Sequence, residues 1–118
     1  MKFEKSISIL YSSDIVTSLN YYIEKLEFDE KWEWDNPPTF GGVRKQDVEI
    51  FFCKNDQGNP GTWLCILIEN VDEYYKTIKN KGAKIITEPQ NREFNIREML
   101  VEDPDGHIIR FGHRIECE

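Results

Sequence analysis

Apolar and polar residues alternate along several short stretches of the chain, and a period of two is typical of a half-buried strand. In the first of these stretches, Ile7, Ile9 and Tyr11 share one face, while Ser8 and Leu10 fall on the other. The pattern predicts strands at residues 3–11, 28–34, 40–44, 47–53, 62–68, 83–87, 97–102 and 107–114.

Two stretches instead repeat apolar residues every three or four positions, which is the spacing of an amphipathic helix. Asp14 and Asn70 precede these stretches and offer side-chain oxygens for N-caps, and Gly82 is placed to end the second helix. The predicted apolar stripes consist of Val16, Leu19, Tyr22 or Ile23, and Leu26 in the first helix, and of Val71, Tyr74, Tyr75 and Ile78 in the second.

Loop-forming residues divide this pattern into two similar halves. Residues 55–61 are rich in Asn, Gly and Pro and separate the halves, and residues 36–38 and 88–91 are predicted as further breaks. Each half then has the order strand, helix, strand, strand, strand. The sequence therefore predicts a single α+β domain over residues 1–118, built from two βαβββ modules at about residues 3–54 and 62–114.

Composition narrows the possible functions. The net charge of −7 argues against a nucleic-acid partner, although an acidic surface is also an ordinary route to solubility. The three cysteines are odd in number and lack Cys-x-x-Cys spacing, so neither a disulfide framework nor a zinc knuckle is expected. Cys53 and Cys65 lie in strand patterns and are expected to be inert core thiols. With no long apolar run at the start, we expect a cytoplasmic protein without a membrane partner.

A polar turn separates the last two predicted strands. Pro104 fixes φ at the first central position, and Gly106 can adopt positive φ where the chain reverses. Taken alone, this pattern predicts only a hairpin. Residues 96–111, which read IREMLVEDPDGHIIRF, carry more information because two copies of the strand-helix pattern precede them.

This segment resembles the glyoxalase/bleomycin resistance/dioxygenase superfamily, also called the vicinal oxygen chelate superfamily, and the likeness extends over about residues 3–111. The resemblance implies two βαβββ modules that form a curved mixed sheet around a cleft. Metal-dependent members bind one divalent ion in that cleft through His, Glu or Gln side chains. Here the matching positions hold Ile7, Glu49, Trp63 and Arg110, of which only Glu49 is a ligand-type residue.

We therefore expect no metal and no other cofactor, and binding rather than catalysis. The alternative is a metal-dependent lyase or isomerase of the glyoxalase or dioxygenase type with its ligands elsewhere. Strand alternation places His107 and His113 on the face opposite Arg110, and both are expected to be exposed rather than to rescue a metal site. A further alternative is a structural or regulatory domain whose cleft is filled by its own side chains.

Segments 42–52, 62–75 and 97–104 look most like the bleomycin resistance proteins. That likeness implies a metal-independent protein that sequesters a small aromatic ligand, expected to be cationic, in a groove. It also implies a homodimer, with the first strand exchanged between chains. The ligand-binding candidates are Trp32, Trp34, Phe40, Glu49, Phe51, Trp63, Arg97 and Arg110.

Each candidate also has a structural alternative. Glu49 and Arg110 carry opposite charges and could simply pair with each other across the cleft. Trp63 and Phe51 could be core residues, in which case truncating Trp63 would destabilise the fold. Trp32 and Trp34 could form a contact between sheets or between subunits.

Overall fold

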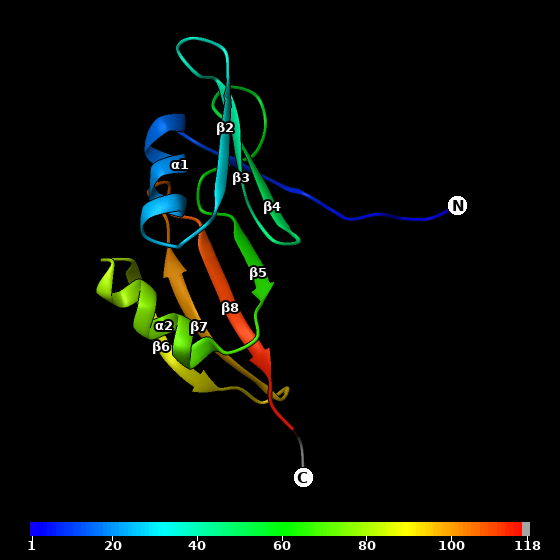
Figure 1. The fold of residues 1–118 in the computed structure, drawn as a ribbon, viewed down its shortest axis with the longest axis vertical. Helices are drawn as coiled ribbons and strands as arrows, with labels where there is room; N and C mark the ends of the chain where they lie inside the picture. The colour runs from blue at the N-terminus through cyan, green and yellow to red at the C-terminus, as the bar shows by residue number, and fades with distance from the viewer. Residues whose placement is uncertain (117–118) are drawn as a thin grey trace.

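A computed structural model describes residues 1–116 and contains two helices and two four-stranded mixed sheets (Figure 1). The first sheet has the strand order β1-β4-β3-β2, and the second has the order β5-β8-β7-β6. The elements are β1 (Ser8–Tyr11), α1 (Ile15–Glu24), β2 (Glu30–Trp34), β3 (Phe40–Lys45), β4 (Val48–Cys53), β5 (Trp63–Leu67), α2 (Val71–Asn80), β6 (Lys84–Asn91), β7 (Ile96–Glu102) and β8 (Ile108–Arg114).

The two halves of the chain have the same topology. In each, the first strand pairs in parallel with the last, β1 with β4 and β5 with β8, and the remaining pairs are antiparallel. The predicted helix caps are present, since Asp14 accepts the Thr17 N–H and Asn70 accepts the Glu73 N–H. The α+β fold of two βαβββ modules is therefore confirmed.

Strand boundaries differ from the prediction by more than two residues in two places. The first strand begins at Ser8 rather than at residue 3, and the preceding segment runs away from the body with Phe3 92% exposed (Figure 1). Residues 88–91, predicted as a loop, continue β6 to Asn91. Pro89 is tolerated there because β6 is an edge strand and its register with β7 shifts between Thr87 and Gln90.

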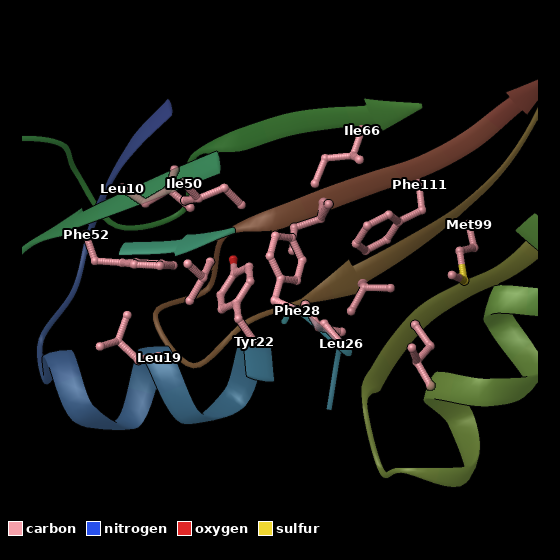
Figure 2. Packing of buried hydrophobic residues seen from close by; sticks show 14 of the residues in the cluster. Leu10, Leu19, Tyr22, Leu26, Phe28, Ile50, Phe52, Ile66, Met99 and Phe111 are labelled. Atoms are coloured by element: carbon pink, nitrogen blue, oxygen red, sulfur yellow. The ribbon is translucent and has the colours of Figure 1, made fainter. Parts of the chain in front are cut away.

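One hydrophobic core joins the two modules. Both helices lie on the same side of the sheets, and the apolar side chains from helices and strands meet between them (Figures 1 and 2). Strand residues that face the helices from both sheets, such as Leu10, Ile50 and Phe111, are buried. The labelled members of the cluster in Figure 2 are Leu10, Leu19, Tyr22, Leu26, Phe28, Ile50, Phe52, Ile66, Met99 and Phe111.

Buried polar groups also connect the modules, and they centre on Asp103 in the β7–β8 turn. Its Oδ2 accepts the hydroxyl of Tyr22 from α1 at 2.8 Å, and its Oδ1 accepts the backbone N–H groups of Asp105 and His107 at 3.0 Å. Burial is the main reason that the pKa of Asp103 is raised above 3.8 and that the pKa of Tyr22 is raised well above 10.0. The turn of the second module is thereby fixed to the helix of the first.

The expectation that both histidines are exposed is wrong. His107 is fully buried, with Nδ1 accepting the Thr62 N–H at 3.0 Å and Nε2 placed 2.7 Å from the Tyr11 carbonyl oxygen. His113 is half-buried and its Nδ1 accepts the Val71 N–H at the start of α2. Both rings satisfy backbone groups, which a strand-alternation pattern alone does not reveal.

Candidate ligand-binding face

Within residues 1–116, no helix or strand covers the side of the sheets away from the helices (Figure 1). We call it the open face. Its positions alternate along the strands with the buried core positions. They include Ile9, Tyr11, Trp32, Trp34, Phe40, Glu49 and Phe51 in the first sheet, and Trp63, Cys65, Leu67, Glu98 and Arg110 in the second.

An aromatic cluster of Trp32, Phe40 and Phe51 occupies the first sheet of the open face. The Trp32 ring centroid lies 5.3 Å from that of Phe51 and 5.7 Å from that of Phe40, and the centroids of Phe40 and Phe51 are 5.5 Å apart. Gly42 makes this possible, because a Cβ at position 42 would lie 2.6 Å from Trp32 Nε1. The indole ring of Trp32 thus lies directly on strand β3 at Gly42.

Glu49 lies beside this cluster on β4 but does not pair with Arg110. Its Oε1 accepts the Lys5 ammonium at 2.7 Å, and the Glu49 side chain is mostly buried while that of Lys5 is half exposed. A cavity of about 190 Å³ separates β4 from β5 and is lined by Glu49 on one side and by Cys65 and Leu67 on the other. The carboxylate therefore lies at the border between the two sheets.

In the second sheet, Trp63 is 59% exposed, so the alternative in which Trp63 is a core residue is wrong. Cys65 is also exposed, contrary to its expected role as a core thiol, whereas Cys53 is buried as expected. Both errors have one cause. The open face has the strand alternation of a buried face, but no helix or strand among the described residues covers it. Cys117 lies outside the described residues.

Arg110 forms an ion pair within its own sheet. Its Nε donates to Glu98 Oε2 at 2.9 Å and its Nη2 to Glu98 Oε1 at 3.2 Å. Arg92, from the β6–β7 turn, donates through Nε to Glu98 Oε1 at 3.1 Å. Sequence reasoning missed Glu98 and Arg92. Glu98 could have been found by counting along the hairpin. Leu100 is the cross-strand partner of Arg110, and Glu98 lies two residues before Leu100, on the same face of β7.

Arg97 does not lie with the other candidates. It is on the helix side of β7, where its Nε and Nη2 groups donate to the Asp72 carboxylate of α2 at 2.9–3.1 Å. Its Nη1 donates to Asn91. Arg97 therefore ties α2 to the second sheet, and we leave it out of the proposed site.

The contribution of the Asp72–Arg97 ion pair to stability can be tested by changing the pH. The hydrogen bonds from Arg97 hold the pKa of Asp72 below 3.8, so the pair stabilises the fold above that value, and this stabilisation is lost as pH falls through the lowered pKa. Arg97→Gln should reduce the free energy of unfolding by roughly 0.2–1 kcal/mol near neutral pH, as for other exposed pairs. Urea unfolding at neutral and acidic pH measures this. An equal loss at both pH values, or in the exposed Arg114→Gln control, would contradict the assignment.

A second cavity of about 770 Å³ lies on the helix side rather than on the open face. It is lined by α2, by the β3–β4 turn and by core residues such as Phe28 and Phe111. Its charged residues are Glu27, Glu69, Glu73 and Lys45, and it contains none of the eight candidates from the sequence. We attribute it to the gap where the two modules meet.

The residues at the superfamily's metal positions do not fit a divalent ion. Ile7 and Trp63 have no donor atom for a metal, and the guanidinium of Arg110 is held by Glu98. Glu49 remains as a single carboxylate, and residues 1–116 contain no group of three or more His, Cys, Asp or Glu side chains arranged to hold a metal ion. We therefore derive no chemistry through a metal at this position.

The fold consists of two βαβββ modules that share one hydrophobic core. A family model of the Glyoxalase/Bleomycin resistance protein/Dioxygenase superfamily matches residues 6–111, so the chain belongs to that superfamily. No curated protein matches the chain. Within residues 1–116, no helix has the length and apolar character needed to cross a membrane.

Solved structures share the fold at low sequence identity. TioX from Micromonospora sp. ML1 is 15% identical, with a TM-score of 0.81 and coverage of 96% of this chain and 100% of that one. The bleomycin-binding protein from Streptomyces verticillus, solved with copper(II)-bleomycin, is 21% identical, with a TM-score of 0.79 and coverage of 100% and 99%. A superfamily member from Sphaerobacter thermophilus is also 21% identical, with a TM-score of 0.79 and coverage of 96% and 98%.

Proposed function

We propose that this protein is a metal-independent small-molecule binding protein that sequesters an aromatic ligand on its open face, as in antibiotic resistance of the bleomycin type. The observation that carries the proposal is the cluster of Trp32, Phe40 and Phe51 beside Glu49, on a face that no helix or strand in the described part of the chain covers. Flat rings stack on such clusters, and a mostly apolar wall with few polar groups is typical of ligand sites.

A cationic group on the ligand has a natural partner in Glu49. In the structure that carboxylate forms a salt bridge with the Lys5 ammonium, but Lys5 is half exposed and lies in the extended segment before β1. The half-exposed Lys5 ammonium regains water when it leaves Glu49, and the ligand cation takes its place on the carboxylate. A ligand cation that also stacks on Phe51 would therefore compete well with Lys5.

The groove itself requires a second wall, which we propose comes from a second copy of the chain. A single chain leaves a run of large apolar side chains in contact with water, and patches of this kind mark interaction surfaces. Those on the open face include Ile9, Trp32, Trp34, Trp63 and Leu67, and Phe94 lies beside Arg110. In the proposed cytoplasmic homodimer the open faces of two chains lie opposite each other, and exchange of the extended residues 1–7 and β1 joins them.

Bleomycin is the first ligand to test, because a structurally similar protein was solved with it. Copper-free and copper-loaded bleomycin are titrated into metal-stripped protein while tryptophan fluorescence is followed. We expect saturable quenching at about one ligand per groove, and a loss of about tenfold in affinity for Phe51→Ala, which corresponds to ~1.4 kcal/mol.

Val16→Ala is the matched control, since Val16 is an exposed apolar residue on α1, on the other side of the sheet. Equal effects of the two substitutions would remove the aromatic cluster from the site. Stoichiometric divalent metal in the purified protein would favour the alternative, a metal-dependent lyase or isomerase. The absence of any response to bleomycin would exclude this ligand and turn the search to other aromatic cations.

A further inference from the structure

Glu98 is the most deeply buried carboxylate of the open face, and two arginines bind it. Only 6% of the Glu98 side chain is exposed, against 33% for Arg110 and 34% for Arg92. We call these three residues the arginine clamp. They come from β7, from β8 and from the turn between β6 and β7.

The charges of the clamp do not balance. A buried carboxylate needs a partner, and the two hydrogen bonds from Arg110 already supply one. Arg92 adds a second positive charge to the same carboxylate, so the three residues together carry a net charge of about +1 at neutral pH. This local excess of positive charge contrasts with the net charge of −7 of the whole chain. A structural ion pair would need only one of the two arginines.

The clamp also keeps unused hydrogen-bond donors. Arg92 reaches Glu98 through Nε, and neither of its Nη atoms donates to another residue within 1–116. Arg110 uses Nε and Nη2, which leaves Nη1 without a protein acceptor in the same part of the chain. Glu98 holds both guanidinium planes in place, and two fixed guanidinium groups are suited to bind a carboxylate or phosphate.

Aromatic side chains border the clamp as they border Glu49. The ring of Phe94, itself 61% exposed, lies 5.8 Å from Arg110 Cζ. Cys65 is the cross-strand neighbour of Arg110 on β5, and the exposed Trp63 lies two residues before it on the same face. An anionic group bound at the clamp would therefore carry its aromatic body over Trp63 or Phe94.

We propose that the arginine clamp is an anion subsite of the open face, which takes a carboxylate, sulfonate or phosphate group of the aromatic ligand. The inference rests on the proposed function and refines it. The open face has a negative pole at Glu49 and a positive pole at Arg92 and Arg110, on opposite sides of the border between β4 and β5. A ligand that fits both poles is dipolar, with a cationic group at one end and an oxyanion at the other.

A matched pair of dyes separates the anionic contact from aromatic stacking. 8-Anilino-1-naphthalenesulfonate and N-phenyl-1-naphthylamine share the same aromatic body, but only the first has a sulfonate. Their fluorescence reports binding to the intact protein. We expect the sulfonate dye to bind about tenfold more tightly, a preference worth ~1.4 kcal/mol, and this preference should shrink as salt is added.

The variants Arg92→Gln and Arg110→Gln each remove one guanidinium and leave Glu98 with the other, which protects the fold. Each should reduce affinity for the sulfonate dye about fivefold and leave affinity for the neutral dye unchanged. Arg44→Gln is the control, because Arg44 is an exposed arginine of the first sheet that pairs with Glu30. Near-ultraviolet circular dichroism confirms that each variant is folded.

The outcomes separate the two proposals. Equal binding of both dyes, or a variant pattern in which Arg44→Gln matches Arg92→Gln, overturns the anion subsite and leaves the aromatic site standing. Failure of the wild-type protein to bind either dye overturns the aromatic site and the anion subsite together. If Arg92→Gln and Arg110→Gln each weaken binding of the sulfonate dye alone, the result supports the aromatic site and the anion subsite.

Discussion

Asp103→Ala should reduce the free energy of unfolding by about 3 kcal/mol or more, the largest loss that we expect from any single polar substitution in this chain. Three donors point at this carboxylate: the Tyr22 hydroxyl and the backbone N–H groups of Asp105 and His107. All three would lose their acceptor at a position where water has little access, since Asp103 is 4% exposed. Each unsatisfied buried donor costs about 1–3 kcal/mol.

Chemical unfolding at neutral pH measures the effect, with Asp47→Ala as the exposed control. Tyr22→Phe removes one of the three donors and should cost about 1–2 kcal/mol, whereas Tyr75→Phe, whose hydroxyl bonds the exposed Glu88, should cost far less. A loss for Asp103→Ala no larger than that for Asp47→Ala would mean that the network does not join the modules.

Asp103 should also make the free energy of unfolding depend on pH. Because burial raises the pKa of Asp103 above 3.8, the native state still holds its proton at a pH where the unfolded chain has released it. Stability from this group is therefore complete below 3.8 and declines as pH rises through the raised native value. Asp103→Asn cannot titrate and should lose that decline, which unfolding curves across the acidic range would reveal.

The fold was predictable because local signals agreed with the global pattern. The caps at Asp14 and Asn70, the turn at Gly106 and the two alternations of strand and helix each indicated the same architecture, and each is present. Sequence reasoning failed at residues 88–91 because a proline on an edge strand resembles a proline in a loop. It failed at His107 because buried polar rings are identified by partners distant in sequence, here Thr62 and Tyr11.

The site was predictable as a face but not as a set of partners. Strand alternation gives Glu49 and Phe51 one face of β4 and gives Trp63 and Arg110 one face of the second sheet, as the strand register does. It gave no information on which charge each would meet, and the structure pairs Glu49 with Lys5 and Arg110 with Glu98. Pairing depends on strand register and side-chain reach, which are set by the turns rather than by the period of two.

The adjacent glycines Gly41 and Gly42 point to opposite faces of β3, so alanine at each should have a different effect. A Cβ at position 41 would lie 2.8 Å from the Trp32 carbonyl oxygen and 3.1 Å from the Ile15 side chain, and backbone cannot easily move away. Gly41→Ala should therefore destabilise the fold by about 1–3 kcal/mol, as overpacking of a core does.

At position 42 the Cβ would instead meet the indole of Trp32 at 2.6–2.9 Å, on the open face. That side chain belongs to the edge strand β2 and can swing toward solvent, so Gly42→Ala should leave stability nearly unchanged. It should, however, separate the indole from Phe51 and Phe40 and so disrupt the aromatic cluster of the open face.

Affinity for an aromatic ligand should then fall about tenfold in Gly42→Ala, equivalent to ~1.4 kcal/mol, although every aromatic residue is retained. Near-ultraviolet circular dichroism would report the displaced tryptophan, and thermal unfolding would separate this variant from Gly41→Ala. If Gly42→Ala binds ligand as the wild type does, the ordered cluster is not the binding surface. If it unfolds as readily as Gly41→Ala, the indole is fixed by the fold and is not an adaptable wall of a ligand site.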